Sequence, residues 1–180
     1  WNCWRGWKRC CAVHAALLST IRDDPRLADL ARSILTGYAE RYLTYPNVDN
    51  VLGPTRLFFS TYLESIWLLQ ICVAADLMSA RDPRLVETVR DRIVEPSRAL
   101  IAEYDEGASN RQVWNDAALL AAARLLDDDA SAERAVHGDS GLTYHLRNGL
   151  LADGSWYEGE NYHLFAHRGL WYGVAMAERA

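Results

Sequence analysis

Three observations predict an all-α fold for this chain. Apolar residues recur at helical spacing along nearly its whole length, and no run alternates with the period of two that a half-buried strand requires. Short turns containing Asp and Pro separate these runs. Half of the 180 residues are hydrophobic, which suffices to bury one sizeable core, and the length suits one domain over 1–180.

The first half of the chain predicts helices over 8–22, 26–44, 57–79 and 83–103. Pro25 and Pro83 stand in first turns, where a missing N–H costs nothing. The run 57–79 is apolar on nearly all sides, as expected of a helix surrounded by others. It could cross a bilayer by length, but Glu64 and Asp76 within it would be costly in lipid, so we expect no membrane span.

The second half predicts helices over 111–127, 131–149 and 160–178. The turn Asp127-Asp128-Asp129-Ala130 separates the first two of these, and a segment containing Gly154 and Gly159 precedes the third. Glu64, the odd residue of the apolar run 57–79, must be paired or functional, and we expect a structural hydrogen bond to Tyr62 or to a neighbouring arginine.

An internal repeat organises these helices into hairpins. Asp24-Pro25-Arg26-Leu27 returns 58 residues later as Asp82-Pro83-Arg84-Leu85, and each copy joins two helices tightly. Helical hairpins of this kind stack into solenoids or closed toroids, so we predict an incomplete (α/α) toroid.

If helices alternate in direction, those beginning near 8, 57, 111 and 160 run parallel. Their N-termini then lie at the end opposite the short turns, together with the longer connections 45–56, 104–110 and 151–159. Such connections commonly carry binding groups on a rigid scaffold. Several positive helix ends facing one opening would favour an anion there.

The charge balance excludes some partners. A net charge of −5 and a pI near 5.5 speak against a nucleic-acid-binding surface. An anionic ligand must be held by local cations, for which Arg56 and Arg111 are candidates. The cysteines lack zinc-site spacing, and the pair His163 and His167 has no evident third ligand, so we expect neither metal nor cofactor.

Two blocks carry the residues with chemical potential, Ser109-Asn110-Arg111-Gln112-Val113-Trp114-Asn115 and Asp153-Gly154-Ser155-Trp156-Tyr157-Glu158-Gly159-Glu160-Asn161-Tyr162-His163. Abstraction of a proton next to a uronate carboxylate needs a group that neutralises the carboxylate, a base and an acid. Asn110 and Arg111 are candidates for the first role. Tyr162 and His163 can exchange protons, provided that cations or donors lower the pKa of the phenol.

The two blocks resemble those of the heparinase II/III-like polysaccharide lyases, through Asn110 in the first block and Asp153, Gly154, Glu158, Tyr162 and His163 in the second. The resemblance implies an α/α-toroid domain that cleaves an anionic polysaccharide, with Asn110 neutralising the uronate and Tyr162 transferring protons during β-elimination. Many relatives have a histidine base after the asparagine, whereas Arg111 stands here and cannot act as a base.

The resemblance also implies a C-terminal β-sandwich in the same chain and a periplasmic or secreted location. The chain begins at Trp1 without a leader, so we interpret it as a fragment of a longer protein. The residues themselves do not indicate the compartment.

Further substrate contacts are expected from aromatic and polar residues near the same opening. Trp156 and Trp4 are candidate platforms for a sugar ring, and Glu158, His167 and Arg56 are candidate polar contacts.

Other interpretations remain open at this point. Asn110 is also a suitable N-cap. An α/α-toroid glycoside hydrolase would use Glu158 with Asp153 or Glu160 as its acid and base. A third interpretation is a non-catalytic helical-repeat module that binds a carbohydrate.

Overall fold

The computed structural model describes the backbone of residues 2–178 and the side chains of residues 11–178. Helices dominate this part of the chain, which contains no strand beyond two isolated bridges, Val48 with Thr55 and Leu150 with Trp156. The prediction of an all-α fold is confirmed. The helices are α1 (Asn2–Arg22), α2 (Pro25–Arg41), α3 (Thr61–Met78), α4 (Pro83–Val89), α5 (Glu95–Ala102), α6 (Asn110–Leu126), α7 (Asp129–His137), α8 (Leu142–Asn148) and α9 (Glu160–Ala177).

Two short segments extend this set. A 3-10 turn, η1 (Tyr42–Thr44), continues α2, and a π-helical turn, η2 (Arg90–Val94), joins α4 to α5. The π turn lies just before Pro96, which cannot donate a backbone hydrogen bond to the preceding turn. The predicted helix 83–103 is therefore continuous but irregular at its centre.

The predicted helix over 131–149 is wrong as a single element, because the structure divides it into α7 and α8. Gly138 ends α7 with extended dihedral angles, φ −62° and ψ 170°. A Cβ atom at Gly138 would lie 2.5 Å from the carbonyl oxygen of Arg134, so the backbone turns where only glycine fits. The segment 138–141 separates the two helices.

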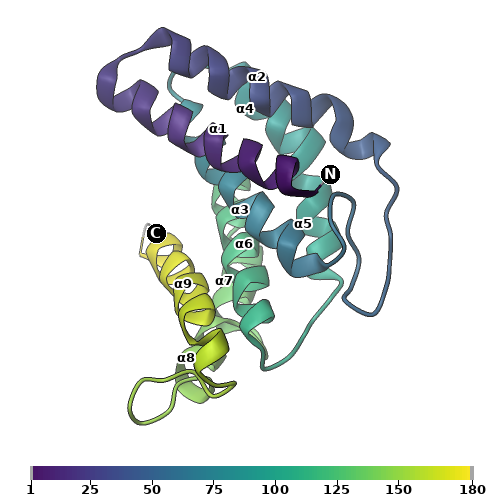
Figure 1. Ribbon diagram of the computed structural model, residues 1–180, viewed down its shortest axis with the longest axis vertical. Coiled ribbons are helices and arrows are strands. Elements are labelled where there is room, and N and C mark those ends of the chain that lie inside the picture. The colour runs from purple at the N-terminus through teal and green to yellow at the C-terminus, as the bar shows by residue number, and fades with distance from the viewer. Residues whose placement is uncertain (1, 179–180) are drawn as a thin grey trace.

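The helices form two layers. Helices α1, α3, α6 and α9 lie in a row in which each packs against the next, while α2, α4, α5 and α7 cover the outer side of this row. Figure 1 shows α1 and α2 at one end of the row and α9 at the other. Consecutive helices pack together as hairpins, α1 with α2, α3 with α4 and α6 with α7.

The short turns share one end of the row. The guanidinium of Arg81, after α3, lies 2.6 Å from the carboxylate of Asp23, after α1, and also donates to the Ser19 carbonyl at 3.2 Å. At the opposite end the Tyr62 and Phe165 rings, from the first turn of α3 and the second turn of α9, meet edge to face. Because α3 has 18 residues, about 27 Å of helix separates the two ends. The opposite placement of turns and helix N-termini agrees with the prediction.

Buried aromatic and carboxylate groups fix the start of α3. The Trp67 ring stacks on Tyr42 and meets Tyr38 edge to face. Glu64 is fully buried, and its carboxylate accepts hydrogen bonds from the Tyr42 hydroxyl at 2.7 Å and the Thr55 hydroxyl at 2.7 Å. The backbone N–H groups of residues 56 and 57 complete its shell. The predicted structural role of Glu64 is confirmed, although its phenolic partner is Tyr42 and not Tyr62.

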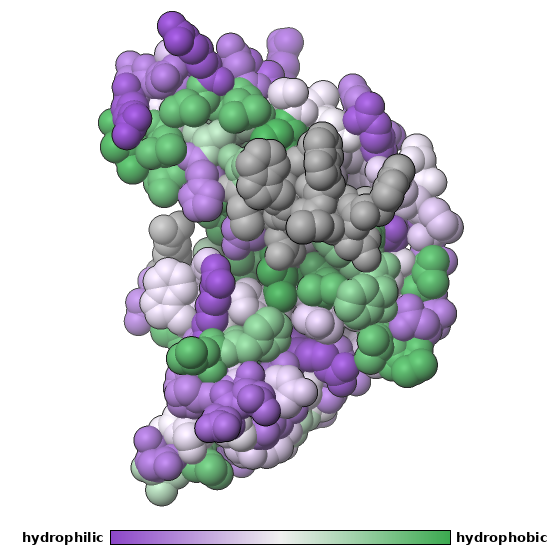
Figure 2. Space-filling view, in the orientation of Figure 1, coloured by the Kyte–Doolittle hydropathy of each residue, from purple (hydrophilic) through white to green (hydrophobic). Residues whose placement is uncertain are grey.

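Helix α3 is long and apolar enough to cross a membrane by length and composition, but 61% of it is buried within the protein. A core helix has the same features, so α3 gives no clear indication of a membrane span. Figure 2 shows hydrophilic side chains gathered over the lower end of the molecule, where α8 and the connection before α9 lie.

Candidate functional site

A cleft of about 520 Å³ opens where α3, α6 and α9 begin. It brings together residues of both sequence blocks, Asn110 and Arg111 from the first and Glu158 and Tyr162 from the second. Its other lining residues are Leu52, Phe59, Tyr62, Asn161 and Phe165. The cleft therefore has a polar side made of the predicted site residues and an aromatic side that the sequence analysis did not identify.

Asn110 is the first residue of α6 and not its cap. The cap is Ser109, whose hydroxyl oxygen accepts from the N–H of Gln112 at 3.0 Å. The interpretation of Asn110 as an N-cap is therefore wrong. Its side chain instead donates from Nδ2 to Oε2 of Glu158 at 2.9 Å, and its backbone N–H donates to the same oxygen at 2.6 Å.

Glu158 places a carboxylate at the positive end of α6. Besides the two donors of Asn110, its Oε2 accepts from the indole Nε1 of Trp156 at 2.7 Å. The start of α6 thus binds an anion, as helix N-termini favour, and this anion belongs to the chain itself. Because Glu158 lines the cleft, a substrate carboxylate would have to bind beside it or displace it.

Arg111 is held in place by a buried partner. Its Nε lies 2.6 Å from Oε2 of Glu106, whose side chain is almost fully buried. Burial raises the pKa of Glu106, and the Arg111 guanidinium opposes that rise. The Arg111 side chain is 37% exposed and lines the cleft. Arg111 therefore offers the cleft an oriented cation, and the Glu106 carboxylate balances part of its charge.

Tyr162 lies in the first turn of α9 and is 48% exposed. Among the described residues, its hydroxyl has no hydrogen-bond partner, so it is free to contact a bound ligand. Gly159, just before the helix, has φ 98°, a left-handed conformation that favours glycine. This glycine sets the direction in which α9 begins and hence where Tyr162 enters the cleft.

His163 and His167 fasten the connection before α9 and do not line the cleft. The Trp156 backbone N–H donates to Nδ1 of His163 at 3.1 Å. Nε2 of His167 lies 3.0 Å from the Gly154 carbonyl oxygen, and the two imidazole centroids are 4.3 Å apart. The structure gives no contact between His163 and the Tyr162 hydroxyl. Among the described residues, no cluster of three His, Cys, Asp or Glu side chains could hold a metal ion.

Trp156 cannot serve as a sugar platform, because only 1% of it is exposed. Its indole points inward, where it packs beside His145 and against Gly149. A Cβ atom at Gly149 would lie 2.3 Å from the indole. The prediction for Trp156 as a stacking surface is wrong, and the residue instead positions Glu158.

Two other predicted substrate contacts are Arg56, which does not reach the cleft, and Trp4, whose side chain is not described. Arg56 donates from Nη1 to the Tyr45 carbonyl at 2.7 Å and stabilises the connection before α3. It does not line the cleft. The side chain of Trp4 lies outside the described residues.

The residues missed by sequence reasoning are mainly aromatic. Tyr62 and Phe165 line the cleft from near the starts of α3 and α9. The exposed Tyr157 lies within the second block and donates its hydroxyl to the Ala108 carbonyl, just before the first block, which ties the two blocks together. The alternating direction of the helices predicted that α3 and α9 begin at the same end. An aromatic residue near the start of each helix could therefore have indicated that both line the cleft.

Carboxylates are scarce in the cleft. Among its described lining residues Glu158 is the one carboxylate. Asp153 accepts from the Ser155 N–H and hydroxyl, which lowers its pKa, and Glu160 is exposed in the first turn of α9. Neither lines the cleft.

Comparison of the chain with models of known protein families gives no match, and comparison with curated proteins gives none either.

Proposed function

We propose that this protein is a polysaccharide lyase that cleaves a uronate-containing chain by β-elimination. The observation that carries the proposal is the meeting of Asn110, Arg111 and Tyr162 in one open cleft, although the two blocks lie about 50 residues apart in the sequence. These are the residue types that elimination next to a carboxylate requires.

Arg111 and Asn110 would bind the uronate carboxylate. Arg111 supplies a guanidinium that Glu106 orients, and the amide of Asn110 is oriented by Glu158. Withdrawal of charge from the carboxylate acidifies the adjacent C–H bond. Prior orientation of both donors lowers the cost of stabilising the charge that develops there.

Tyr162 would transfer the protons. As a phenolate it takes the proton from the carbon next to the carboxylate, and the C–H electron pair forms the new double bond while the glycosidic C–O bond breaks. The phenol then returns the proton to the departing oxygen. Arg111 lines the same cleft and supplies a positive charge there.

The architecture supports the same proposal at a coarser level. Parallel inner helices covered by outer ones form a curved stack, which we interpret as part of an (α/α) toroid. We further propose that a β-sandwich of the same chain completes the cleft, and that the substrate is an anionic polysaccharide.

The hydrolase alternative has less support. Hydrolysis needs two carboxyl groups on either side of the bond, about 5 to 9.5 Å apart. Glu158 is the one carboxylate among the described lining residues, and the donors of Asn110 and Trp156 already occupy one of its oxygens. A binding module without catalysis would need the cleft but not the free hydroxyl of Tyr162.

The test is to incubate the full natural chain with a panel of uronate polymers and matched neutral polymers. Product formation is followed by ultraviolet absorbance, which detects the double bond, and by reducing ends, which detect any cleavage. A lyase gives both signals in equal amounts. Reducing ends without absorbance would identify a hydrolase, and saturable binding with neither signal would identify a binding module.

A further inference from the structure

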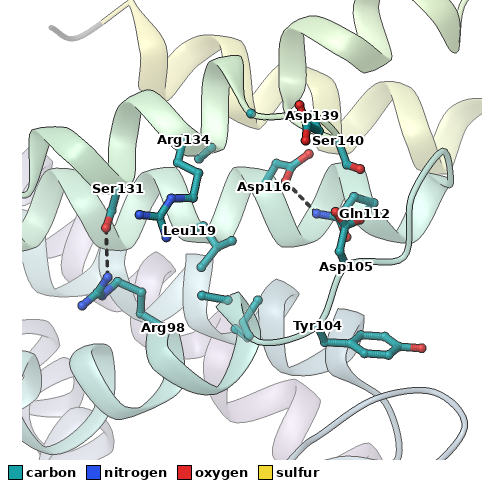
Figure 3. A pocket seen from close by; sticks show the side chains of 15 residues that line it. Arg98, Tyr104, Asp105, Gln112, Asp116, Leu119, Ser131, Arg134, Asp139 and Ser140 are labelled. Atoms are coloured by element: carbon teal, nitrogen blue, oxygen red, sulfur yellow. Dashed lines mark hydrogen bonds between the residues drawn. The ribbon is translucent and has the colours of Figure 1, made fainter.

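A second pocket, of about 370 Å³, lies between α5, α6, α7 and the segment 138–141. It shares no lining residue with the cleft. Figure 3 shows Asp116 and Gln112 of α6 on one side, Arg98 and Arg134 on the other, and Leu119 between them. Its volume lies within the range of natural small-molecule sites, toward the lower end.

A buried carboxylate without a full set of partners lines this pocket. Asp116 is only 3% exposed. Its Oδ1 accepts from Nε2 of Gln112 at 2.8 Å, whereas its Oδ2 has no hydrogen-bond partner. Nε2 of the buried His145 lies 3.4 Å from Oδ2, within ion-pair distance but without the geometry of a hydrogen bond. A buried acceptor in this state is costly unless something binds it.

The polar groups of the pocket are separated by charge. Asp105, Asp116 and Asp139 lie toward one end with the Ser140 hydroxyl, as Figure 3 shows. Arg98 and Arg134 lie toward the other. Arg98 is already bound to Glu95 and to the Ser131 hydroxyl, but Arg134 has no ion-pair partner among the described residues.

We propose that this pocket binds a small zwitterion, a molecule with an ammonium group at one end and a carboxylate at the other. The ammonium would donate to Oδ2 of Asp116 and to the carboxylate of Asp139. The carboxylate would bind the guanidinium of Arg134. The aliphatic part between the two charges would lie over Leu119, and Asp116, Asp139 and Arg134 would each gain a partner.

The test is calorimetric titration of the full chain with linear amino acids of increasing length, from glycine to 6-aminohexanoate. Butylamine and butyrate, each with one of the two charges, are the matched control ligands. We expect one or two of the amino acids to bind at least about tenfold more tightly than either single-charge compound. The best length reports the distance between the two ends.

Variants identify which residues bind the ammonium end of the ligand and which bind its carboxylate end. The exposed substitutions Arg134→Gln and Asp139→Asn should each weaken binding by about tenfold or more, and Asp116→Asn should weaken it further. Arg26→Gln, an exposed substitution on α2, is the matched control and should leave binding unchanged. Affinity should rise as the pH increases through about 6, where Asp116 ionises, and this rise should be absent in Asp116→Asn.

Two results would overturn the proposal. One is a failure of all amino acids to bind saturably at millimolar concentration. The other is binding that Arg134→Gln and Asp139→Asn both leave unchanged, which would place the ligand elsewhere. Neither variant depends on the tolerance of the core for Asp116→Asn.

Discussion

The side-chain amide of Asn110 donates a 2.9 Å hydrogen bond to the carboxylate of Glu158. This bond joins the first residue of α6 to the connection before α9 and orients the amide within the cleft. Because Ser109 is the cap of α6, the side chain of Asn110 is not needed to begin the helix. A role in the cleft is therefore separable from a role in stability.

Tyr162→Phe should fold normally and lose catalysis. The substitution keeps the half-exposed ring and deletes a hydroxyl with no partner among the described residues. The free energy of unfolding should change by less than about 0.5 kcal/mol. Elimination should slow by about a hundred- to ten-thousandfold, the usual effect of losing a general acid or base. Initial rates of ultraviolet absorbance, together with urea unfolding, measure both quantities.

Tyr144→Phe is the matched control, since Tyr144 lies on α8 and does not line the cleft. It should retain the rate of the unmodified protein. Equal rates for Tyr162→Phe and Tyr144→Phe would eliminate Tyr162 as the proton-transfer residue.

Asn110→Ala and Ser109→Ala should separate function from capping. Loss of the oriented amide should reduce kcat by about a hundredfold or more. Loss of the cap should cost about 1 kcal/mol of stability with little change in kcat for the folded protein. Chemical denaturation and steady-state kinetics on both variants provide the comparison. The reverse pattern would make Asn110 a structural residue.

Glu158→Ala should destabilise the protein by about 1 to 3 kcal/mol, because the Trp156 indole and the backbone N–H of Asn110 lose their acceptor. Glu158→Gln keeps one acceptor oxygen and should be the milder change in thermal unfolding. If Glu158 were a hydrolytic acid or base, Glu158→Gln would instead lose more activity than Tyr162→Phe.

Glu64→Ala should be among the most damaging substitutions. It removes the buried acceptor of two hydroxyl and two backbone N–H donors, including those of Tyr42 and Thr55. The expected loss is about 3 to 5 kcal/mol in urea unfolding. Glu87→Ala, an exposed change on α4, is the control and should be nearly neutral. A loss below about 1 kcal/mol would show that water replaces the carboxylate.

The stability of the protein should depend on pH through Asp116. Burial raises the pKa of Asp116 to about 6, above its value in the unfolded chain, although the neighbouring His145 and Gln112 favour its ionised form. The associated stability is fully present below about pH 4 and is lost as the pH rises through about 6. The free energy of unfolding should be measured for Asp116→Asn and for the unmodified protein from pH 4 to pH 7. As the pH rises, the variant should become more stable relative to the unmodified protein. A difference independent of pH would contradict this reading.

Much of the fold follows from the sequence because the helical period and the Asp-Pro turns act locally. The boundaries of α6 and α9 agree with the predicted helices within a residue or two. The break between α7 and α8 escaped prediction, since Gly138 and Gly141 stand in a run that keeps its apolar spacing. These two glycines determine the direction of the backbone, and the spacing of apolar residues carries no information about that direction.

The sequence predicted part of the membership of the site. Helix parity brought Asn110, Arg111, Glu158 and Tyr162 to one end, and the structure places them in one cleft. Periodicity gave no sign that Trp156 would turn inward, because its packing against Gly149 and beside His145 depends on the tertiary structure. Partners distant in sequence, such as Glu158 for Asn110, depend on packing that local patterns do not encode.

The most direct test of the central claim is the ultraviolet absorbance of the product formed from uronate polymers by the full chain, measured beside Tyr162→Phe. The proposed mechanism predicts absorbance that rises in proportion to reducing ends for the unmodified protein and falls by about a hundredfold or more in the variant. Reducing ends without absorbance, or equal absorbance from both proteins, would contradict it.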